Sequence, residues 1–341
     1  MKTYYLLVVA SLLLTVPAMA AAMGQCPFNS LAGTGAITQN ANARGNLDGV
    51  TGLGWFDLCT SDVAGQSTPY RAMGTEFMTY TETWDQPQTL GTVMIASPTV
   101  ERSTAGTIYV KTSPDPEAPY VPVCDFNEAQ GKLGFYDVNR TGVYGVKIEV
   151  NQKSIGAGDY YQIGSIGLYE ERFVDVAYGM ATIGSVNAAQ LGNMTDHDIG
   201  NSSRFTSQTI GSDATGQQYV GVSLGQDKLI QGLLIETSAY GDNSAWKNFD
   251  VQVFVDVTGE GEYDWVTLGR ASQDSLTDLY WVDFGPGGVL TSAVRLYGDV
   301  DGGNHPDGKL ISAIMAFEVV PEPATMTLLV LGGLSLLRRR R

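Results

Sequence analysis

The side chains that most often carry catalysis are scarce in this chain. Of its 341 residues, only two are histidines and three are cysteines. A serine–histidine–aspartate arrangement would need His197 or His305, and neither lies in a recognised motif. The 36 acidic residues offer many carboxylate pairs for glycoside hydrolysis, but nothing singles out one pair. The sequence therefore predicts no enzyme activity and no organic cofactor.

The cysteines can form at most one internal disulfide. Cys26, Cys59 and Cys124 all lie in the first half of the chain, so three pairings are open. A disulfide between Cys59 and Cys124 is favoured slightly, because Cys26 lies nearest the N-terminus of an exported chain. An unpaired cysteine would also be free to cross-link two chains.

The charge balance excludes one class of partner. The chain carries 20 Lys and Arg against 36 Asp and Glu, a net charge of −16. Nucleic-acid binding needs a basic stripe that neutralises phosphates, and this composition does not supply one.

Residues 1–20 have the pattern of a secretory signal peptide. Lys2 precedes an apolar run over 4–16, and Ala18 and Ala20 form the small-x-small pattern that signal peptidase cleaves after. The alternative is an N-terminal membrane anchor, but the apolar run is short for spanning a bilayer.

Residues 320–341 have the pattern of a second targeting signal. Pro321, Glu322 and Pro323 precede an apolar stretch over 324–337, and four arginines end the chain. The stretch has 14 residues, fewer than the roughly 20 that span a bilayer. The segment resembles the PEP-CTERM sorting signal of exopolysaccharide-producing Gram-negative bacteria. The resemblance implies transient anchoring in the inner membrane and cleavage by an exosortase. A plain tail anchor is the alternative.

Without the N-terminal signal peptide and the C-terminal sorting segment, the net charge is more negative. Cleavage at both ends leaves 15 basic and 36 acidic residues, a net charge of −21. The acid excess therefore belongs to the part of the chain that works outside the cell.

The elements that must position any site are β-strands. Apolar residues alternate in short runs bounded by Gly, Asp, Asn and Pro, which predicts an antiparallel all-β chain built as sandwiches. The segment 256–262 is expected to be a Gly-rich hairpin rather than a cation loop. Trp265 is expected in the core. The clearest predicted strands are 219–224, 229–236, 249–257, 265–268, 293–297 and 311–319.

The two halves of the chain repeat each other at an offset of 140 to 148 residues. A period this long indicates a duplicated domain rather than a solenoid. We therefore predict domains at 26–170 and 175–319, joined by a linker at 171–174. The matching segments include 90–95 with 230–235, 143–148 with 291–296, and 163–170 with 311–318.

The second half resembles the F5/8 type C (discoidin-like) family, and the first half follows it more weakly. The resemblance implies two tandem jelly-roll β-sandwiches of the galactose-binding-like fold. The sequence departs from the family at Phe205, where a Trp is common, and in a longer loop at 239–248. The features that match in order are 176–182, 196–198, 204–207, 219–225, 230–235, 249–255, 265–268, 293–298 and 310–318.

The family resemblance also implies a structural cation near the first turn of each domain. The acids in the matching places are Asp48 with Glu170 and Asp196 with Glu318, each pair 122 residues apart. Such oxygen ligands suit Ca²⁺, so one calcium ion per domain is a hypothesis. The alternative is that all four acids are solvated surface residues.

In this fold class, sugars bind to loops at one end of the sandwich. Aromatic faces stack on the sugar ring while polar side chains bond its hydroxyls. Trp246 is the best single candidate, because polar residues flank it on both sides. The full set of candidates is Trp55, Tyr70, Arg71, Trp84, Arg204, Phe205, Trp246, Asn304 and His305.

Two functions follow from the sequence. The first is an exported, non-enzymatic protein of the cell surface or extracellular matrix that binds carbohydrate, either exopolysaccharide or a surface glycan. The second is a structural matrix or adhesion protein that contacts other proteins and has no sugar site.

Overall fold

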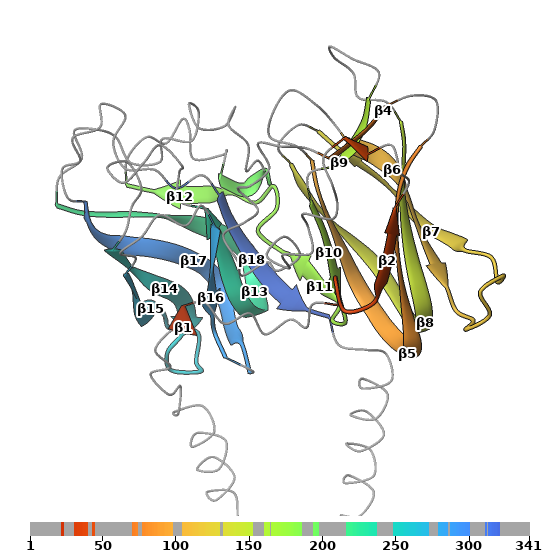
Figure 1. Cartoon of the computed structure of the whole chain (residues 1–341). Coiled ribbons are helices and arrows are strands. Elements are labelled where there is room, and N and C mark those ends of the chain that lie inside the picture. The colour runs from red at the N-terminus through yellow and green to blue at the C-terminus, as the bar shows by residue number, and fades with distance from the viewer. Residues whose placement is uncertain are drawn as a thin grey trace, which may run out of the picture.

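The structure is a computed structural model, and its regular elements are strands (Figure 1). Within the described ranges there is no α-helix, which confirms the all-β class. Accordingly, no helix among the described residues is long and apolar enough to cross a membrane. The described residues are 22–23, 31–39, 43–44, 70–73, 77–97, 104–129, 132–152, 160–163, 165–185, 194–197, 216–236, 248–272, 279–285, 287–300, 311 and 313–320.

The first half forms a six-stranded sheet and a three-stranded sheet. The larger sheet has the order β10-β5-β8-β6-β7, with β2 also paired to β5, and the smaller has the order β3-β4-β9. All of these pairings are antiparallel. The strands are β2 (Ala36–Gln39), β3 (Ala43–Arg44), β4 (Tyr70–Met73), β5 (Met78–Ala96), β6 (Thr104–Lys111), β7 (Val121–Glu128), β8 (Leu133–Gln152), β9 (Tyr160–Ile163) and β10 (Ser165–Tyr169).

The second half forms a nine-stranded sheet. Its central order is β16-β13-β17-β14-β15, and β12 and β18 also pair with β13. One strand from the start of the chain, β1 (Ala22–Met23), pairs with β16. The remaining strands are β11 (Phe173–Asp175), β12 (Thr182–Gly184), β13 (Gly216–Glu236), β14 (Asn248–Asp256), β15 (Tyr263–Ser272), β16 (Leu279–Asp283), β17 (Val289–Val300) and β18 (Ala313–Val319).

The two halves share one strand order. The path β10-β5-β8-β6-β7 of the first half has its counterpart in β18-β13-β17-β14-β15 of the second. Even the register breaks correspond, because β5 slips against β8 after Thr83 and β13 slips against β17 after Ser223. Gly225 lies in that second break with φ of +75°, a conformation that favours glycine. The repeat in the sequence is therefore also a repeat of topology.

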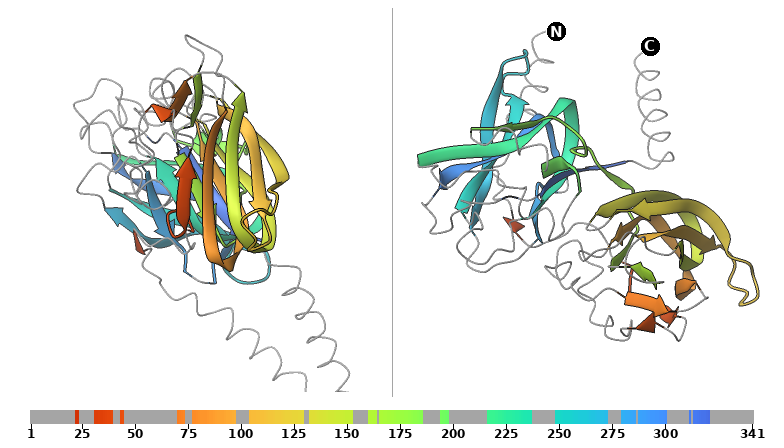
Figure 2. Two further views of the ribbon diagram at one scale, coloured as in Figure 1. Left: turned by 45° about the vertical axis from the view of Figure 1, so that its right-hand side comes forward. Right: turned by 90° about the horizontal axis from the view of Figure 1, so that it is seen from above.

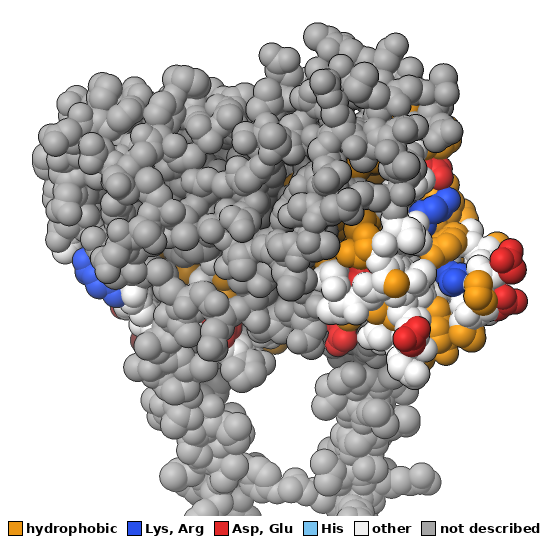
Figure 3. Space-filling model, viewed as in Figure 1, with side chains coloured by type: hydrophobic (Ala, Val, Ile, Leu, Met, Phe, Trp, Pro, Cys, Tyr) orange, Lys and Arg blue, Asp and Glu red, His pale blue; other side chains and the backbone are white. Residues whose placement is uncertain are grey.

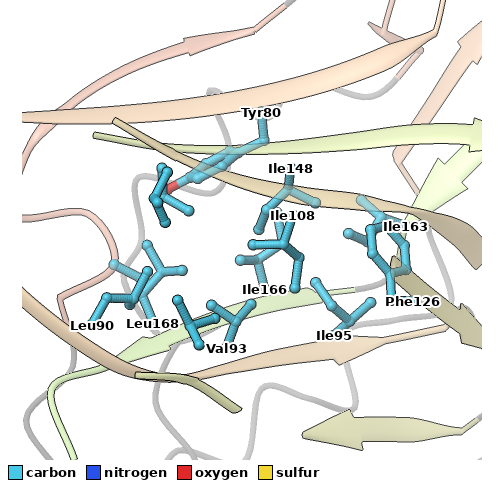
Figure 4. Packing of buried hydrophobic residues seen from close by; sticks show 14 of the residues in the cluster. Tyr80, Leu90, Val93, Ile95, Ile108, Phe126, Ile148, Ile163, Ile166 and Leu168 are labelled. Atoms are coloured by element: carbon cyan, nitrogen blue, oxygen red, sulfur yellow. The ribbon is translucent and has the colours of Figure 1, made fainter. Parts of the chain in front are cut away.

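Each half has its own apolar core. Figure 4 shows the first core, where Ile95, Ile108 and Ile148 from three neighbouring strands meet Ile166. The second core is built in the same way around Val251 and other buried residues of β13, β14, β17 and β18. Because alternate residues of a strand point to opposite faces, each long strand presents one set of side chains to its core. Two separate cores are what two domains would need.

A buried carboxylate fixes one loop of the first core. Glu82 is fully buried, yet its oxygens accept hydrogen bonds from the Tyr80 hydroxyl at 2.6 Å and from the N–H groups of Gly33 and Gly35 at 3.1 and 2.7 Å. Burial raises the pKa of Tyr80, and the neighbouring Glu82 charge adds to the rise. The three donors offset the cost of burying the acid.

A third apolar cluster joins the two halves. It contains Met94 and Tyr169 from the first half and Leu234, Trp281 and Phe317 from the second, all buried. β10 belongs to the first sheet and β11 and β18 belong to the second, and these strands lie toward the middle of Figure 1. The view from above in Figure 2 shows the two sheets apart. The halves are therefore packed on one another through an apolar interface.

The segment predicted to be a linker is part of this interface. Phe173 is only 2% exposed, and β11 pairs with β18. The ring of Phe173 packs edge-on against Tyr169 and Phe317, with ring centroids 5.3 Å apart in both cases. An isolated aromatic residue between two repeats gave no periodic signal, so the sequence did not predict a buried strand here.

The described surface of the first half is mixed in character. Figure 3 shows acidic, basic and hydrophobic side chains interspersed on the face in view. This pattern is typical of a solvated surface rather than of a large apolar contact.

Candidate functional site

A cavity of about 570 Å³ lies where the two halves meet. One wall comes from the end of β7 and the start of β8, and the other from β11 and the short segment 194–197. The apolar cluster between the halves lies beside it, because Leu133 and Phe135 belong to both. We call this cavity the interdomain cleft.

The wall from the first half carries a carboxylate bonded to a phenol. The Tyr136 hydroxyl donates a hydrogen bond to the Glu128 carboxylate, and it accepts one from the Asn127 N–H at 3.3 Å. Gly134 makes room for this pair, since a Cβ atom at that position would collide with the Glu128 carboxylate. The two side chains are thus held in one arrangement by the backbone around them.

Burial controls the ionisation of both groups. Burial raises the pKa of Glu128, although the Tyr136 hydroxyl, His197 and Lys132 each act to lower it. The pKa of Tyr136 is also raised, first by burial and then by its bond to Glu128. Tyr136 therefore stays a neutral donor at physiological pH.

The wall from the second half carries an aspartate–histidine pair. The His197 Nε2 atom lies 2.6 Å from Asp175 Oδ2. The other carboxylate oxygen of Asp175 accepts the N–H groups of Ala177 and Ala316 at 2.9 and 2.8 Å. His197 has a left-handed backbone with φ of +61°, which is uncommon outside glycine. The imidazole is therefore fixed in place by a buried, fully bonded carboxylate.

Contacts across the cleft connect its two walls. The Leu133 N–H donates to the His197 carbonyl at 3.1 Å. The Lys132 Nζ atom lies 2.8 Å from the Asp196 carbonyl and 2.9 Å from its carboxylate. Close by, Arg172 forms an ion pair with Asp137, in which Arg172 Nε lies 2.8 Å from Asp137 Oδ1. The cleft exists only while the two halves are in contact.

Aromatic rings complete the cleft. The Phe135 ring packs edge-on against His197 with centroids 5.5 Å apart. The Tyr178 ring lies 4.3 Å from the His197 ring on the open side, and Tyr178 is 60% exposed. The cleft thus combines an accessible flat ring with fixed donors and acceptors.

None of the described residues that line the cleft is Ser, Thr or Cys, so the hydroxyl groups among them are the phenols of Tyr136 and Tyr178. Among the described residues no group of three His, Cys, Asp or Glu side chains could hold a metal ion.

The acids predicted to bind calcium have other neighbours where they are described. Asp196 lies at the edge of the cleft and pairs with Lys132. Glu318, on β18, pairs with Lys228 at 3.6 Å. Glu170 follows β10, and Asp48 lies outside the described residues. Calcium binding stays a prediction, and a lysine beside each acid of the second pair disfavours a cation there.

Two tryptophans lie elsewhere than the sequence predicted. Trp84, a sugar-contact candidate, is 8% exposed and packs in the first core, with its indole N–H donating to Thr34 Oγ1 at 3.0 Å. Trp265, assigned to the core, is only half-buried and packs against Phe254 on the outer face of its sheet. Trp84 was expected in a loop but lies within β5, on the face that enters the core. For Trp265 strand alternation is the reason, since a shift of one residue moves a side chain to the other face.

The hairpin at 256–262 is confirmed. Asp256 Oδ1 accepts the N–H groups of Thr258 and Gly259, and Oδ2 accepts that of Gly261, which closes the turn between β14 and β15. Cys124, by contrast, carries a free thiol, so the favoured disulfide is not formed. Its sulfur is half-buried against the first core on β7, where burial raises its pKa.

The remaining predicted site residues give no contacts that can be described. Tyr70 and Arg71 lie on β4, and only their backbone is described. The other sequence-predicted residues fall outside the described ranges, namely Trp55, Arg204, Phe205, Trp246, Asn304, His305, Cys26, Cys59, Ala18, Ala20, Pro321, Glu322 and Pro323.

Comparison with known proteins identifies one end of the chain. Residues 319–341 match the PEP-CTERM protein-sorting motif. The motif indicates an exported protein that is sorted at the membrane and processed by an exosortase. Among curated proteins, no match was found.

Solved structures with a distant likeness are mostly carbohydrate-binding proteins. A family 32 carbohydrate-binding module of NanJ from C. perfringens, in complex with galactose, is 10% identical, with coverage of 43% of this chain and 99% of the module and a TM-score of 0.34. A tandem pair of such modules from Clostridium perfringens ZmpB, in complex with GalNAc, is 8% identical, covering 86% and 92%, with a TM-score of 0.30. A fucolectin from striped bass, Morone saxatilis, is 9% identical, covering 87% and 100%, with a TM-score of 0.30. These values describe a distant likeness, and the functional argument therefore starts from the residues of this chain.

Proposed function

We propose that this chain is an exported, non-enzymatic carbohydrate-binding protein whose interdomain cleft holds part of a glycan. The observation that carries the proposal is the Tyr178 ring, 60% exposed at the mouth of a cavity of about 570 Å³ lined with fixed polar groups. Small-molecule sites of roughly 300–1,000 Å³ that combine apolar walls with a few placed polar groups are common.

The chemistry of the cleft matches that of a sugar. A pyranose presents hydroxyls that donate and accept, together with a patch of C–H groups that stacks on an aromatic ring. Glu128 and Asp196 offer carboxylate acceptors, Lys132 offers a donor, and Tyr178 offers the ring. Because the polar groups are already held by partners, the site is largely preformed and loses little entropy on binding.

The size and the charge of the cleft limit the ligand. Its volume admits a chain end or a short oligosaccharide rather than a long segment of polymer. Acids outnumber bases among the lining residues, which disfavours an anionic sugar. The proposed partner is therefore a neutral end of an exopolysaccharide or surface glycan.

The sorting motif supports the proposed location. Signal peptidase and exosortase would process the two ends, and the chain would then act at the outer surface or in the extracellular matrix of a Gram-negative bacterium. A protein that holds a glycan without altering it suits that location.

Calorimetric titration of the purified chain with a panel of neutral mono- and oligosaccharides tests the cleft. Tyr178→Ala is expected to weaken binding about tenfold, which corresponds to ~1.4 kcal/mol. Phe77→Ala removes another exposed aromatic residue, outside the cleft, and is the matched control. Equal affinities of the wild type and Tyr178→Ala would refute the cleft as the site.

A structural matrix role is the second candidate. Leu229 and Leu290 are exposed and face each other across β13 and β17, which favours contact with another protein. The absence of binding to any glycan, together with co-sedimentation with matrix proteins, would support this role.

A further inference from the structure

The outer face of the second sheet carries an ordered set of aromatic rings. On β14, Val251 and Val253 point into the second core, so Gln252 and Phe254 point to the opposite face. Across β14 and β15, Phe254 pairs with Trp265, and their ring centroids are 5.2 Å apart.

The rings continue along β15 and across two further strands. Tyr263 on β15 stacks on Phe254 with centroids 5.5 Å apart and is 42% exposed. Across β17 and β13, Tyr297 is the direct partner of Tyr219. The face thus spans four strands in the order β13-β17-β14-β15. We call it the aromatic–arginine face, after these rings and the residue at its centre.

Arg295 lies at the centre of this face. The carbon of its guanidinium lies 4.0 Å from the Trp265 ring centroid, 5.0 Å from that of Tyr297 and 5.2 Å from that of Tyr219. Its Nε donates to Gln252 Oε1 at 2.7 Å, and Gln252 Nε2 donates to Thr267 Oγ1 at 2.9 Å. The planar guanidinium is therefore fixed by rings and by one amide.

No described acid forms an ion pair with Arg295, and no described atom accepts from its terminal nitrogens. Burial lowers the pKa of Arg295, although the two tyrosines and the charge of Asp264 act to raise it. Arg295 is half-buried, and among the described residues its terminal N–H groups have no acceptor, so they can serve a bidentate acceptor of a ligand.

In the first half, the cation at the position equivalent to Arg295 has an acidic partner within the same sheet. Lys147 on β8 corresponds to Arg295, at the repeat offset of 148. Its Nζ lies over the Tyr109 ring at 4.0 Å but also pairs with Glu149 at 3.1 Å. Tyr297 stands where Glu149 stands in the first half. The duplicated positions have therefore diverged, and only the second half leaves the cation open.

The charges around the face indicate a neutral ligand. Asp264 is exposed beside Trp265, Asp250 lies 3.5 Å from Arg270, and Asp227 accepts from the Tyr263 hydroxyl at 3.0 Å. These acids repel an anionic polymer, yet they can accept from sugar hydroxyls. Three strand spacings of about 4.8 Å make the face about 14 Å wide, enough for a run of sugar rings.

We propose that the aromatic–arginine face is a second carbohydrate site, which binds the interior of a neutral polysaccharide chain. Its rings stack on successive pyranoses while Arg295 bonds a pair of neighbouring hydroxyls. The proposal extends the proposed function, because the cleft would hold a chain end and this face a chain interior. Two sites on one chain gain avidity for the same polymer.

Affinity electrophoresis of the full exported chain tests the site. The gels contain a neutral β-glucan, galactan or mannan, or polygalacturonate as the anionic arm. Trp265→Ala and Arg295→Gln are expected to reduce retardation by at least one neutral polymer about tenfold. Lys147→Gln, at the equivalent position of the first half, is the matched control. Relative to a gel without polymer, it should be retarded as strongly as the wild type is. Thermal unfolding of each variant confirms that it is folded.

The cleft variant separates the two sites. Both sites are supported if Tyr178→Ala weakens the binding of short oligosaccharides but not of long polymers, and Trp265→Ala weakens the binding of long polymers but not of short oligosaccharides. If Trp265→Ala and Arg295→Gln bind as the wild type does while Tyr178→Ala loses all binding, the face is refuted and the cleft stands. Stronger retardation by polygalacturonate than by every neutral polymer overturns the neutral ligand. No retardation in any gel, together with no heat in the titrations, overturns both sites.

Discussion

Phe173→Ala should separate the two halves without unfolding either of them. Phe173 is 2% exposed and belongs to the cluster between the halves, not to either domain core. It lies on β11, the strand that also carries Asp175 into the cleft. The substitution therefore acts on the interface and, through it, on the cleft.

The magnitude follows from what the ring contacts. Replacing a buried Phe by Ala typically costs about 3–5 kcal/mol. The Phe173 ring makes three edge-on contacts, with Tyr169 and Phe317 at 5.3 Å and with Phe135 at 5.9 Å. Each such pair adds about 0.5–1.5 kcal/mol beyond burial. A loss of about 4 kcal/mol is a large fraction of the roughly 5–15 kcal/mol that typically stabilises a folded protein, and here it falls on the interface.

Scanning calorimetry measures the effect. The wild type is expected to unfold in one transition and Phe173→Ala in two, because the halves no longer support each other. Val121→Ala, on an exposed position of β7, should change stability by less than about 0.5 kcal/mol. Loss of the interface should weaken oligosaccharide binding in the cleft, whereas polysaccharide binding to the aromatic–arginine face should be unchanged. A single unshifted transition in Phe173→Ala would refute the interface as the element that couples the halves.

Three further predictions test the buried acids and the proposed cation. Because burial raises the pKa of Glu128, the folded state binds its proton more tightly than the unfolded chain does. The stability that this proton contributes is fully present below the pKa of Glu128 in the unfolded chain. It is lost as the pH rises through the pKa of Glu128 in the folded state. In denaturant titrations the free energy of unfolding of Glu128→Gln should therefore rise relative to that of the wild type between about pH 4 and pH 7. A difference that stays constant with pH would contradict this. Glu82→Leu should cost about 3 kcal/mol or more in the same titrations, because the buried Tyr80 hydroxyl and two half-buried N–H groups lose their acceptor. A loss below about 1 kcal/mol would be inconsistent with this. If the predicted structural Ca²⁺ is present, a chelator should lower the melting temperature, and an unchanged value would rule the ion out.

The strands were predictable because their signal is local. The predicted segments 249–257 and 311–319 coincide with β14 and β18 within two residues. The predicted segments 219–224 and 229–236 are both parts of one long strand, β13, which continues through a bulge. The duplication was predictable because the repeated segments keep their order. Residue-level positions were harder, as Trp265 shows, since the face of a side chain depends on register.

The cleft was not predictable from local patterns. Its residues come from the segments 127–136, 174–178 and 196–197, which are distant in sequence and meet only through the packing of the halves. Glu128 and Tyr136 have no motif around them, and Tyr178 lies in the segment 176–182, to which the family resemblance gave no binding role. A carboxylate becomes part of a site when burial and a partner act on it, and neither can be read from its neighbours in the chain.

The sequence nevertheless contains a signal for the interface that creates the cleft. The runs Val93–Ala96, Leu233–Ile235 and Ile314–Phe317 are apolar without alternation. A strand that reads this way is buried on both faces. In each run one face enters a domain core, and the other enters the cluster between the halves, where Met94 and Leu234 occupy equivalent positions of the repeat. The duplicated halves therefore pack through equivalent surfaces, as two subunits of a symmetric dimer would. Among the described residues strand β11 has no counterpart in the first half and pairs with β18 alone, so it breaks this symmetry, and the cleft lies on the side where it does so.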